Sequence, residues 1–281
     1  MKLFAEYFNT TYRHLANTFF SLIALLAFIP ANSSALEQDD AAALLKSLHQ
    51  AQIQSYFTIN AFYNFSANDG DKALLMDVNE AINNVNSILN TLEAFKELDE
   101  VKGEIEAANQ SWQKHKTTLN TITNDILDQG YADLRLMSDL ALQNQEFANV
   151  LSAGYDKVEN DGSYKLNKVA AKSRESALLM ASMMTKYSAR TTSNVSQIFQ
   201  GGDDEKTIDV LATDMDKNLK DLLATANTEQ KKSVDAVLTK WDFIRNSYIN
   251  YNEKNVNYVV NLYSKRIINA LGTTSDLNEI Q

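Results

Sequence analysis

The sequence predicts an all-α fold made of two tandem antiparallel helical-bundle units, each similar to a four-helix bundle. The 281 residues contain one proline, eight glycines and no cysteine, so the residues that usually interrupt helices are scarce. Apolar residues recur three or four positions apart over long stretches, which is the spacing of a helical seam. A turn, an amphipathic helix and a single tryptophan also follow one another in the same order in each half of the chain.

Residues 1–35 have the pattern of a signal peptide. Lys2 and Arg13 make a weakly basic start, an apolar stretch runs from Leu15 to Ile29, and the small residues Ser33-Ser34-Ala35 follow. The apolar stretch is shorter than the roughly 20 residues that span a bilayer. We therefore expect cleavage after residue 35 and a soluble periplasmic or secreted protein. The alternative is that the segment is retained as an N-terminal membrane anchor.

The first bundle unit is predicted over residues 36–158. Its first helix ends near Phe65, before the turn Asn68-Asp69-Gly70-Asp71. An amphipathic helix follows, and then a long third helix with Trp112 in the middle of its seam. That seam continues past Gly130, so the third helix is predicted to be very long and either bent or interrupted there. Its seam residues are Leu98, Val101, Ile105, Ala108, Trp112, Leu119, Ile122 and Ile126.

The second unit is predicted over residues 163–281 and repeats this order. A helix ends near Phe199, the turn Gly201-Gly202-Asp203-Asp204 follows, and Trp241 lies in the seam of a later helix. That seam is predicted to be continuous, with only Asn255 out of place; its residues are Val234, Val237, Trp241, Ile244, Tyr248, Tyr251, Tyr258 and Leu262. The recurrence predicts an internal duplication. Whether the units stack end to end or share long helices is left open.

The composition does not favour nucleic-acid binding or catalysis. The formal net charge is −10, which repels phosphate backbones. After residue 35 the only histidines are His49 and His115, and neither has partners at metal-ligand spacing. No catalytic residues, cofactor or metal site are therefore predicted, and His115 is interpreted as a core or boundary histidine.

Polar residues interrupt the seam of the first helix in each unit. In the first unit Gln52 and Ser55 occupy consecutive seam positions, and burying such groups without partners costs about 1–3 kcal/mol each. In the second unit Lys186 and Arg190 share a face with Leu179. Either these long side chains reach solvent from a bundle edge, or the helices hold a small polar or anionic ligand between them.

The segment Gln52-Ile53-Gln54-Ser55-Tyr56 resembles the first-helix signature of periplasmic sensor domains of nitrate/nitrite sensors and type IV pilus chemotaxis transducers. The segment from Met180 to Tyr187 is similar to the same signature. The resemblance implies an exported sensory protein with two such domains. The family's anion-contacting arginine falls on Gln52 and on Leu179, and a shift of one heptad places Lys186 at the position of Gln52 and Arg190 at that of Tyr56.

These observations predict a periplasmic sensory or ligand-binding accessory protein that acts through a membrane receptor or transducer. The expected ligand is a small anion or organic acid, bound by the second unit in preference to the first. The candidate ligand-binding residues are Gln52, Ser55, Tyr56, Lys186 and Arg190. The alternative is a structural or protein-interaction module without a small ligand, for instance a homodimer in which Tyr248, Tyr251 and Tyr258 face another chain.

Overall fold

The computed structural model describes residues 36–190 and 206–279, and over these ranges it is all-α, which confirms the predicted class. Contacts divide the chain into two units, Met1–Ala35 and Leu36–Gln281, and only the second contains described residues. The predicted signal peptide lies outside the described residues, as do Phe199 and the turn at Gly201-Gly202-Asp203-Asp204.

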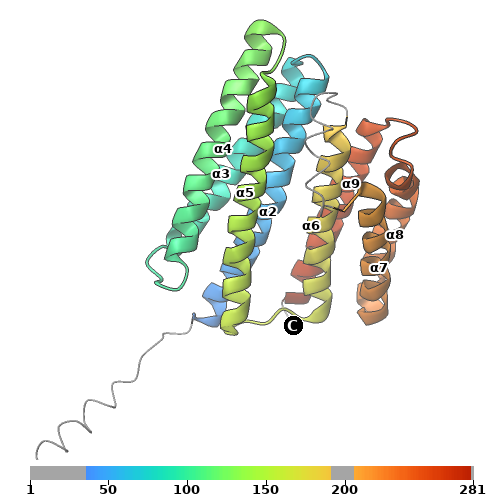
Figure 1. Ribbon diagram of the computed structural model, residues 1–281. Helices are drawn as coiled ribbons and strands as arrows, with labels where there is room; N and C mark the ends of the chain where they lie inside the picture. The colour runs from blue at the N-terminus through green and yellow to red at the C-terminus, as the bar shows by residue number, and fades with distance from the viewer. Residues whose placement is uncertain (1–35, 191–205, 280–281) are drawn as a thin grey trace, which may run out of the picture. The chain divides into compact units, whose positions relative to one another are not determined.

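One group of helices shares a hydrophobic core around Trp112, Phe62, Phe65 and Phe147 (Figure 1). Its members are α2 (Gln38–Ala67), α3 (Lys72–Leu92), α4 (Lys102–Gln129) and α5 (Leu134–Asp161), with a short 3-10 helix, Glu93–Phe95, after α3. A second group shares a core around Trp241, Tyr187, Tyr248 and Met180. Its members are α6 (Lys168–Ala189), α7 (Ile208–Thr225), α8 (Thr228–Ile249) and α9 (Asn257–Glu279).

Several helices begin where an Asp or Asn side chain can cap their first backbone N–H groups. Asp71 accepts from Ala73 and Leu74 at the start of α3, in the predicted turn after α2. Asp133, Asn167 and Asn227 cap α5, α6 and α8 in the same way. These residues compete with the helix interior for hydrogen bonds, so they favour helix starts.

The seam that crosses Gly130 belongs to two helices. Gly130 adopts a left-handed conformation with φ of 80° and ends α4. The chain then reverses, as the pairing of Lys114 with Glu146 at 2.9 Å and of Lys157 with Glu104 at 2.8 Å shows. The predicted third helix is therefore interrupted and folds back as the antiparallel pair α4 and α5.

The predicted continuous seam from Val234 to Leu262 is wrong beyond Tyr248. Helix α8 ends at Ile249, and α9 begins at Asn257. Tyr258, predicted to lie in the seam, is 79% exposed. The intervening Asn250-Tyr251-Asn252-Glu253-Lys254-Asn255 is rich in asparagine, whose side chain supports turns in place of helix.

The two tryptophans make corresponding hydrogen bonds. Trp112 Nε1 donates to Asn86 Oδ1 on α3 at 2.8 Å, and Trp241 Nε1 donates to Asp216 Oδ1 on α7 at 2.8 Å. The same bond from matching helices supports the predicted duplication. The division into units 36–158 and 163–281 stays a prediction, because Leu36–Gln281 forms one compact unit.

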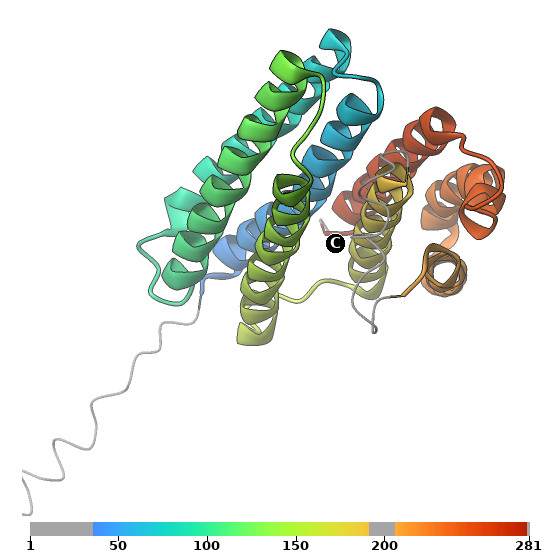
Figure 2. The ribbon, with the colours of Figure 1, turned by 45° about the horizontal axis from the view of Figure 1, so that its top comes forward.

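Helices α2 and α6 join the two groups of helices. In both ribbon views α6 and α9 lie between α2 and the pair α7 and α8 (Figures 1 and 2). A buried polar network holds this junction: Asn60 Nδ2 and Asn261 Nδ2 donate to Ser188 Oγ at 2.8 and 2.9 Å. Asn257 Nδ2 donates to Asn64 Oδ1 at 2.6 Å. Such networks fix one alignment of neighbouring helices, because a shift leaves buried polar groups unpaired.

Two glycines with positive φ provide a matched test of this packing. A Cβ on Gly70 (φ 76°) would lie 2.9 Å from Ile126 Cγ2, whereas one on Gly130 (φ 80°) meets nothing within 4 Å. We expect Gly130→Ala to lower the free energy of unfolding by about 1–2 kcal/mol through backbone strain alone, and Gly70→Ala to lower it further. Urea unfolding measures both. Equal urea midpoints for the two variants would show that a Cβ at position 70 does not clash with Ile126.

Candidate functional site

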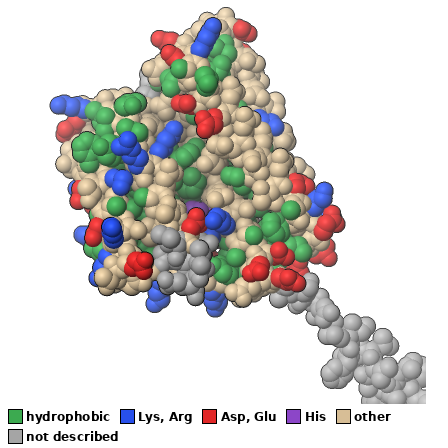
Figure 3. Space-filling model, turned by 180° about the vertical axis from the view of Figure 1, so that it is seen from behind, with side chains coloured by type: hydrophobic (Ala, Val, Ile, Leu, Met, Phe, Trp, Pro, Cys, Tyr) green, Lys and Arg blue, Asp and Glu red, His purple; other side chains and the backbone are tan. Residues whose placement is uncertain are grey.

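A cavity of about 610 Å³ opens between α2, α3, α6 and α9. The space-filling view from behind (Figure 3) shows a hollow in this face, with side chains of both charges beside it. The volume lies within the roughly 300–1,000 Å³ of small-molecule sites. Its apolar wall consists of Ile53, Ile88, Ala177 and Ile268.

Helical periodicity explains why α2 contributes so much of the lining. The cavity residues of α2 are Lys46, His49, Gln50, Ile53 and Gln54. Their spacing of three, four, seven and eight from Lys46 places them on one face of the helix. At 1.5 Å per residue this stripe is about 12 Å long. The α2 side of this cavity, which we call the groove, is therefore a single face of the helix about 12 Å long.

Arg174 is the charged residue most deeply placed in this wall. It comes from α6 and is only 4% exposed. Its Nη1 donates to Tyr155 Oη at 3.4 Å, and its guanidinium carbon lies 6.0 Å from the centre of the Tyr155 ring. At the rim, Lys46 Nζ pairs with Asp276 Oδ1 at 2.9 Å, with both side chains about half exposed. A buried guanidinium interacts more strongly with an anion than a solvated one does.

His49 lies in the same wall as Arg174. Burial, together with the positive charge of Arg174, lowers the pKa of His49 to about 3. The ring is therefore neutral at physiological pH and offers one hydrogen-bond donor and one acceptor.

Gln54 carries an unsatisfied acceptor in this cavity. Its Oε1 is buried and accepts no hydrogen bond from any residue that the structure describes. A buried carbonyl without a donor costs about 1–3 kcal/mol. Such a group is satisfied when water or a ligand supplies the donor.

A smaller cavity of about 270 Å³ lies between α2, α5 and α6 and shares His49 and Arg174 with the first. Three carboxylates, Asp156, Glu159 and Glu175, also line it. Their negative charges disfavour the binding of an anion in this smaller cavity. The larger cavity is the better candidate, since its lining has two cations and one carboxylate.

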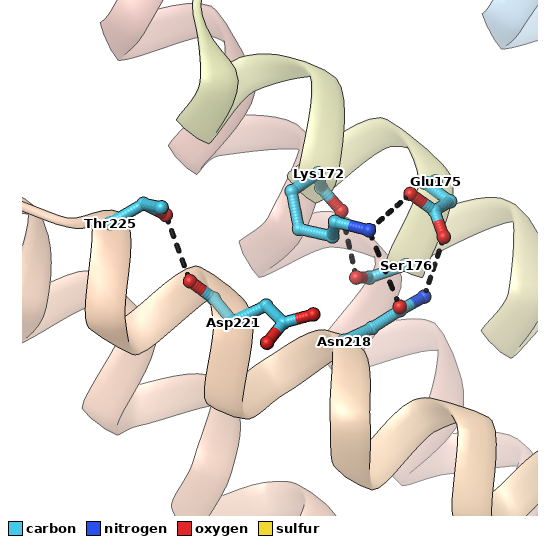
Figure 4. Close-up of polar contacts among 6 residues, drawn as sticks. All are labelled: Lys172, Glu175, Ser176, Asn218, Asp221 and Thr225. Carbon is cyan, nitrogen blue, oxygen red and sulfur yellow. Dashed lines mark hydrogen bonds and ion pairs between the residues drawn. The ribbon is translucent and has the colours of Figure 1, made fainter.

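A third cavity of about 470 Å³ lies beside α6 and α7, and its lining contains both lysines and carboxylates. Lys206 pairs with Asp214 at 2.6 Å. Next to it, Lys172 pairs with Glu175 at 2.6 Å, and Asn218 Nδ2 donates to Glu175 Oε1 at 3.0 Å (Figure 4). These bonds tie α6 to α7 and compensate the charge of Lys172. We interpret this region as structural.

The five candidate residues that were predicted from the sequence do not lie together in one cavity. Gln52 lines the smaller cavity and Tyr56 the third. Ser55 is buried, and its Oγ donates to Gln52 O at 2.8 Å within α2. The Arg190 guanidinium lies 5.3 Å from the ring centre of Tyr187 and 5.0 Å from that of Tyr251.

Ser55, Lys186 and Arg190 line none of the three cavities described above. Sequence reasoning missed Arg174 and Gln54. The spacing of the stripe from Lys46 to Gln54 could have indicated Gln54, because it places polar side chains on one helical face. Ligand binding by the original five residues stays a prediction.

His115 is fully buried in α4 and stacks on Trp112, with ring centres 5.5 Å apart. This placement confirms its interpretation as a core histidine. The described part of the chain contains no group of three or more His, Asp or Glu residues arranged to hold a metal ion.

Within residues 36–190 and 206–279, no helix combines the length and apolar character needed to cross a bilayer. Comparison of the chain with family models, curated proteins and solved structures finds no match.

Proposed function

We propose that this is an exported sensory or accessory protein that binds a small anion or organic acid between α2, α3, α6 and α9. The observation that carries the proposal is the buried Arg174 in the wall of a cavity of ligand size. A carboxylate placed there gains a charge-assisted hydrogen bond in a site shielded from water. The neutral His49 and the apolar wall favour a small organic acid over a fully hydrated inorganic ion.

The position of the cavity suggests how binding is transmitted. Its walls come from both groups of helices, which meet at α2 and α6. A ligand that contacts both walls favours the helix packing in which both can reach it. In this proposal, a membrane receptor or transducer reads that packing. The resemblance of α2 and α6 to sensor-domain signatures supports the same class of partner.

Thermal denaturation with saturating organic acids tests the proposal. At about one hundred times its dissociation constant a ligand stabilises the fold by about 2.7 kcal/mol. For a unit of this size we expect a rise in Tm of about 5–10 °C. Arg174→Gln should lose most of this shift, whereas Arg190→Ala, which removes a cation at the C-terminal cap of the same helix and outside the cavity lining, should keep it.

Circular dichroism establishes whether Arg174→Gln folds, and Lys46→Ala at the rim provides a second, milder variant. Loss of the shift in Arg190→Ala alone would place the ligand at the residues predicted from the sequence. No shift with any organic acid or small anion would contradict the proposal.

Exposed aromatic side chains favour a second candidate, a protein-interaction module. Phe243 on α8 is 61% exposed and Tyr258 on α9 is 79% exposed. Tyr248, predicted to face another chain, is instead buried, and its hydroxyl lies 2.7 Å from Ser264 Oγ. Size-exclusion chromatography with light scattering separates the candidates: a stable homodimer without a ligand response supports this one.

A further inference from the structure

We infer that the ligand of the cavity between α2, α3, α6 and α9 is a small amino carboxylate, a molecule that carries both a carboxylate and an ammonium group. The inference rests on the proposed function and narrows its ligand class. It is drawn from the donor-only and the unsatisfied acceptor groups among the residues that line this cavity.

The cationic part of the groove comes from Arg174. Its side chain is nearly inaccessible to solvent, yet it forms part of the wall. Guanidinium N–H groups are donors only, so the ligand group that faces them must accept hydrogen bonds. A carboxylate fits this requirement and matches the charge.

A second group in the lining needs a donor. Gln54 Oε1 is buried and has no donor among the described residues. The Asn269 amide on α9 adds an acceptor oxygen to the same lining, whereas the Asp276 carboxylate is already paired with Lys46 at the rim. A simple carboxylic acid in its ionised form has no donor to offer Gln54. An ammonium group has three donors, so it can satisfy Gln54 Oε1 where an ionised carboxylate cannot.

The dimensions allow one ligand to meet both requirements. The α2 stripe from Lys46 to Gln54 is about 12 Å long, and Arg174 of α6 lines the same groove as both ends of it. A five-carbon chain fits within this length. The apolar residues Ile53, Ala177 and Ile268 line the same groove and can contact its methylene groups.

Four probes with the same five-carbon chain separate the contribution of the carboxylate to binding from that of the ammonium group. Pentanoate has only the carboxylate, pentylamine has only the ammonium, and 2-aminopentanoate and 5-aminopentanoate have both at different separations. Isothermal titration calorimetry of the full chain gives their dissociation constants. We expect one of the aminopentanoates to bind at least tenfold more tightly than pentanoate, a ratio that corresponds to about 1.4 kcal/mol.

Two matched glutamine variants locate the donor contact. Gln54→Leu should reduce the aminopentanoate-to-pentanoate ratio to about one, while it leaves the affinity for pentanoate within about twofold. Gln50→Leu changes the same residue type one turn earlier on the stripe, at an exposed position, and should keep the ratio. The pentanoate affinity of Gln54→Leu also reports that this variant is folded.

The outcomes distinguish this inference from the proposed function. If pentanoate binds as tightly as both aminopentanoates, the amino carboxylate class is wrong and the proposed function stands. If Gln54→Leu retains the preference, the inference is overturned as well. If none of the probes binds, both the inference and organic-acid binding in this cavity fail together.

Discussion

Replacing Trp241 with alanine is expected to lower the free energy of unfolding by about 3–5 kcal/mol, the range for large aromatic truncations in protein cores. The side chain is 1% exposed and lies 5.8 Å from the Tyr248 ring centre. Its indole also donates to Asp216, which Arg245 holds through bonds of 2.6–2.9 Å. Truncation opens a cavity in the second core and removes the hydrogen bond between α8 and α7.

Urea unfolding followed by circular dichroism measures this change. Phe243→Ala is the control, because it truncates an aromatic residue of the same helix that is 61% exposed. We expect the control to cost less than about 1 kcal/mol. Equal losses in the two variants would contradict the assignment of Trp241 to the core.

The second large expected effect is a loss of folding stability at acid pH that comes from His115. Burial lowers the pKa of His115 from 6.5 to about 4, although a backbone contact at Leu140 acts in the opposite direction. The folded state therefore binds this proton less readily than the unfolded state does. The stability associated with the neutral ring is fully present above pH 6.5 and is lost as the pH falls from 6.5 towards 4.

At 1.36 kcal/mol for each pH unit, this depression corresponds to about 3 kcal/mol. A His115→Leu variant has no such proton to bind, so its stability should fall by about 3 kcal/mol less between pH 7 and pH 4. Urea unfolding at a series of pH values compares the variant with the native chain. His49 and the carboxylates are common to both proteins and cancel in the difference. Parallel pH profiles would show that His115 is not buried as a neutral ring.

The fold class was predictable because it depends on local signals that every helix repeats. The seam residues Ile105, Trp112, Leu119 and Ile126 are all buried in the structure. The ends of the helices were harder to predict, because apolar spacing can continue by chance across a turn. At Gly130 and at Asn250 the chain reverses while the seven-residue pattern persists in the sequence.

The candidate site was harder to predict than the fold. The sequence indicated that the first helix of each half carries an unusual polar face, and α2 does contribute five residues to the cavity lining. The choice between Arg174, Lys186 and Arg190 depends on how α2 packs on α6. That packing is set by contacts such as Asn60 to Ser188, which are 128 residues apart. Periodicity within one helix carries no information about such a contact.

The most direct test of ligand binding beside Arg174 is a titration of histidine ring signals by NMR. His49 lines the cavity, and His115 lies in the core around Trp112, outside the cavity lining. His49→Gln and His115→Leu variants assign the two signals in the full chain, which also contains His14. On addition of 5-aminopentanoate, 2-aminopentanoate or pentanoate we expect the His49 signal to shift in a saturable way, while the His115 signal stays fixed. Calorimetric binding with no shift of His49 would contradict the assignment of the ligand site to this cavity.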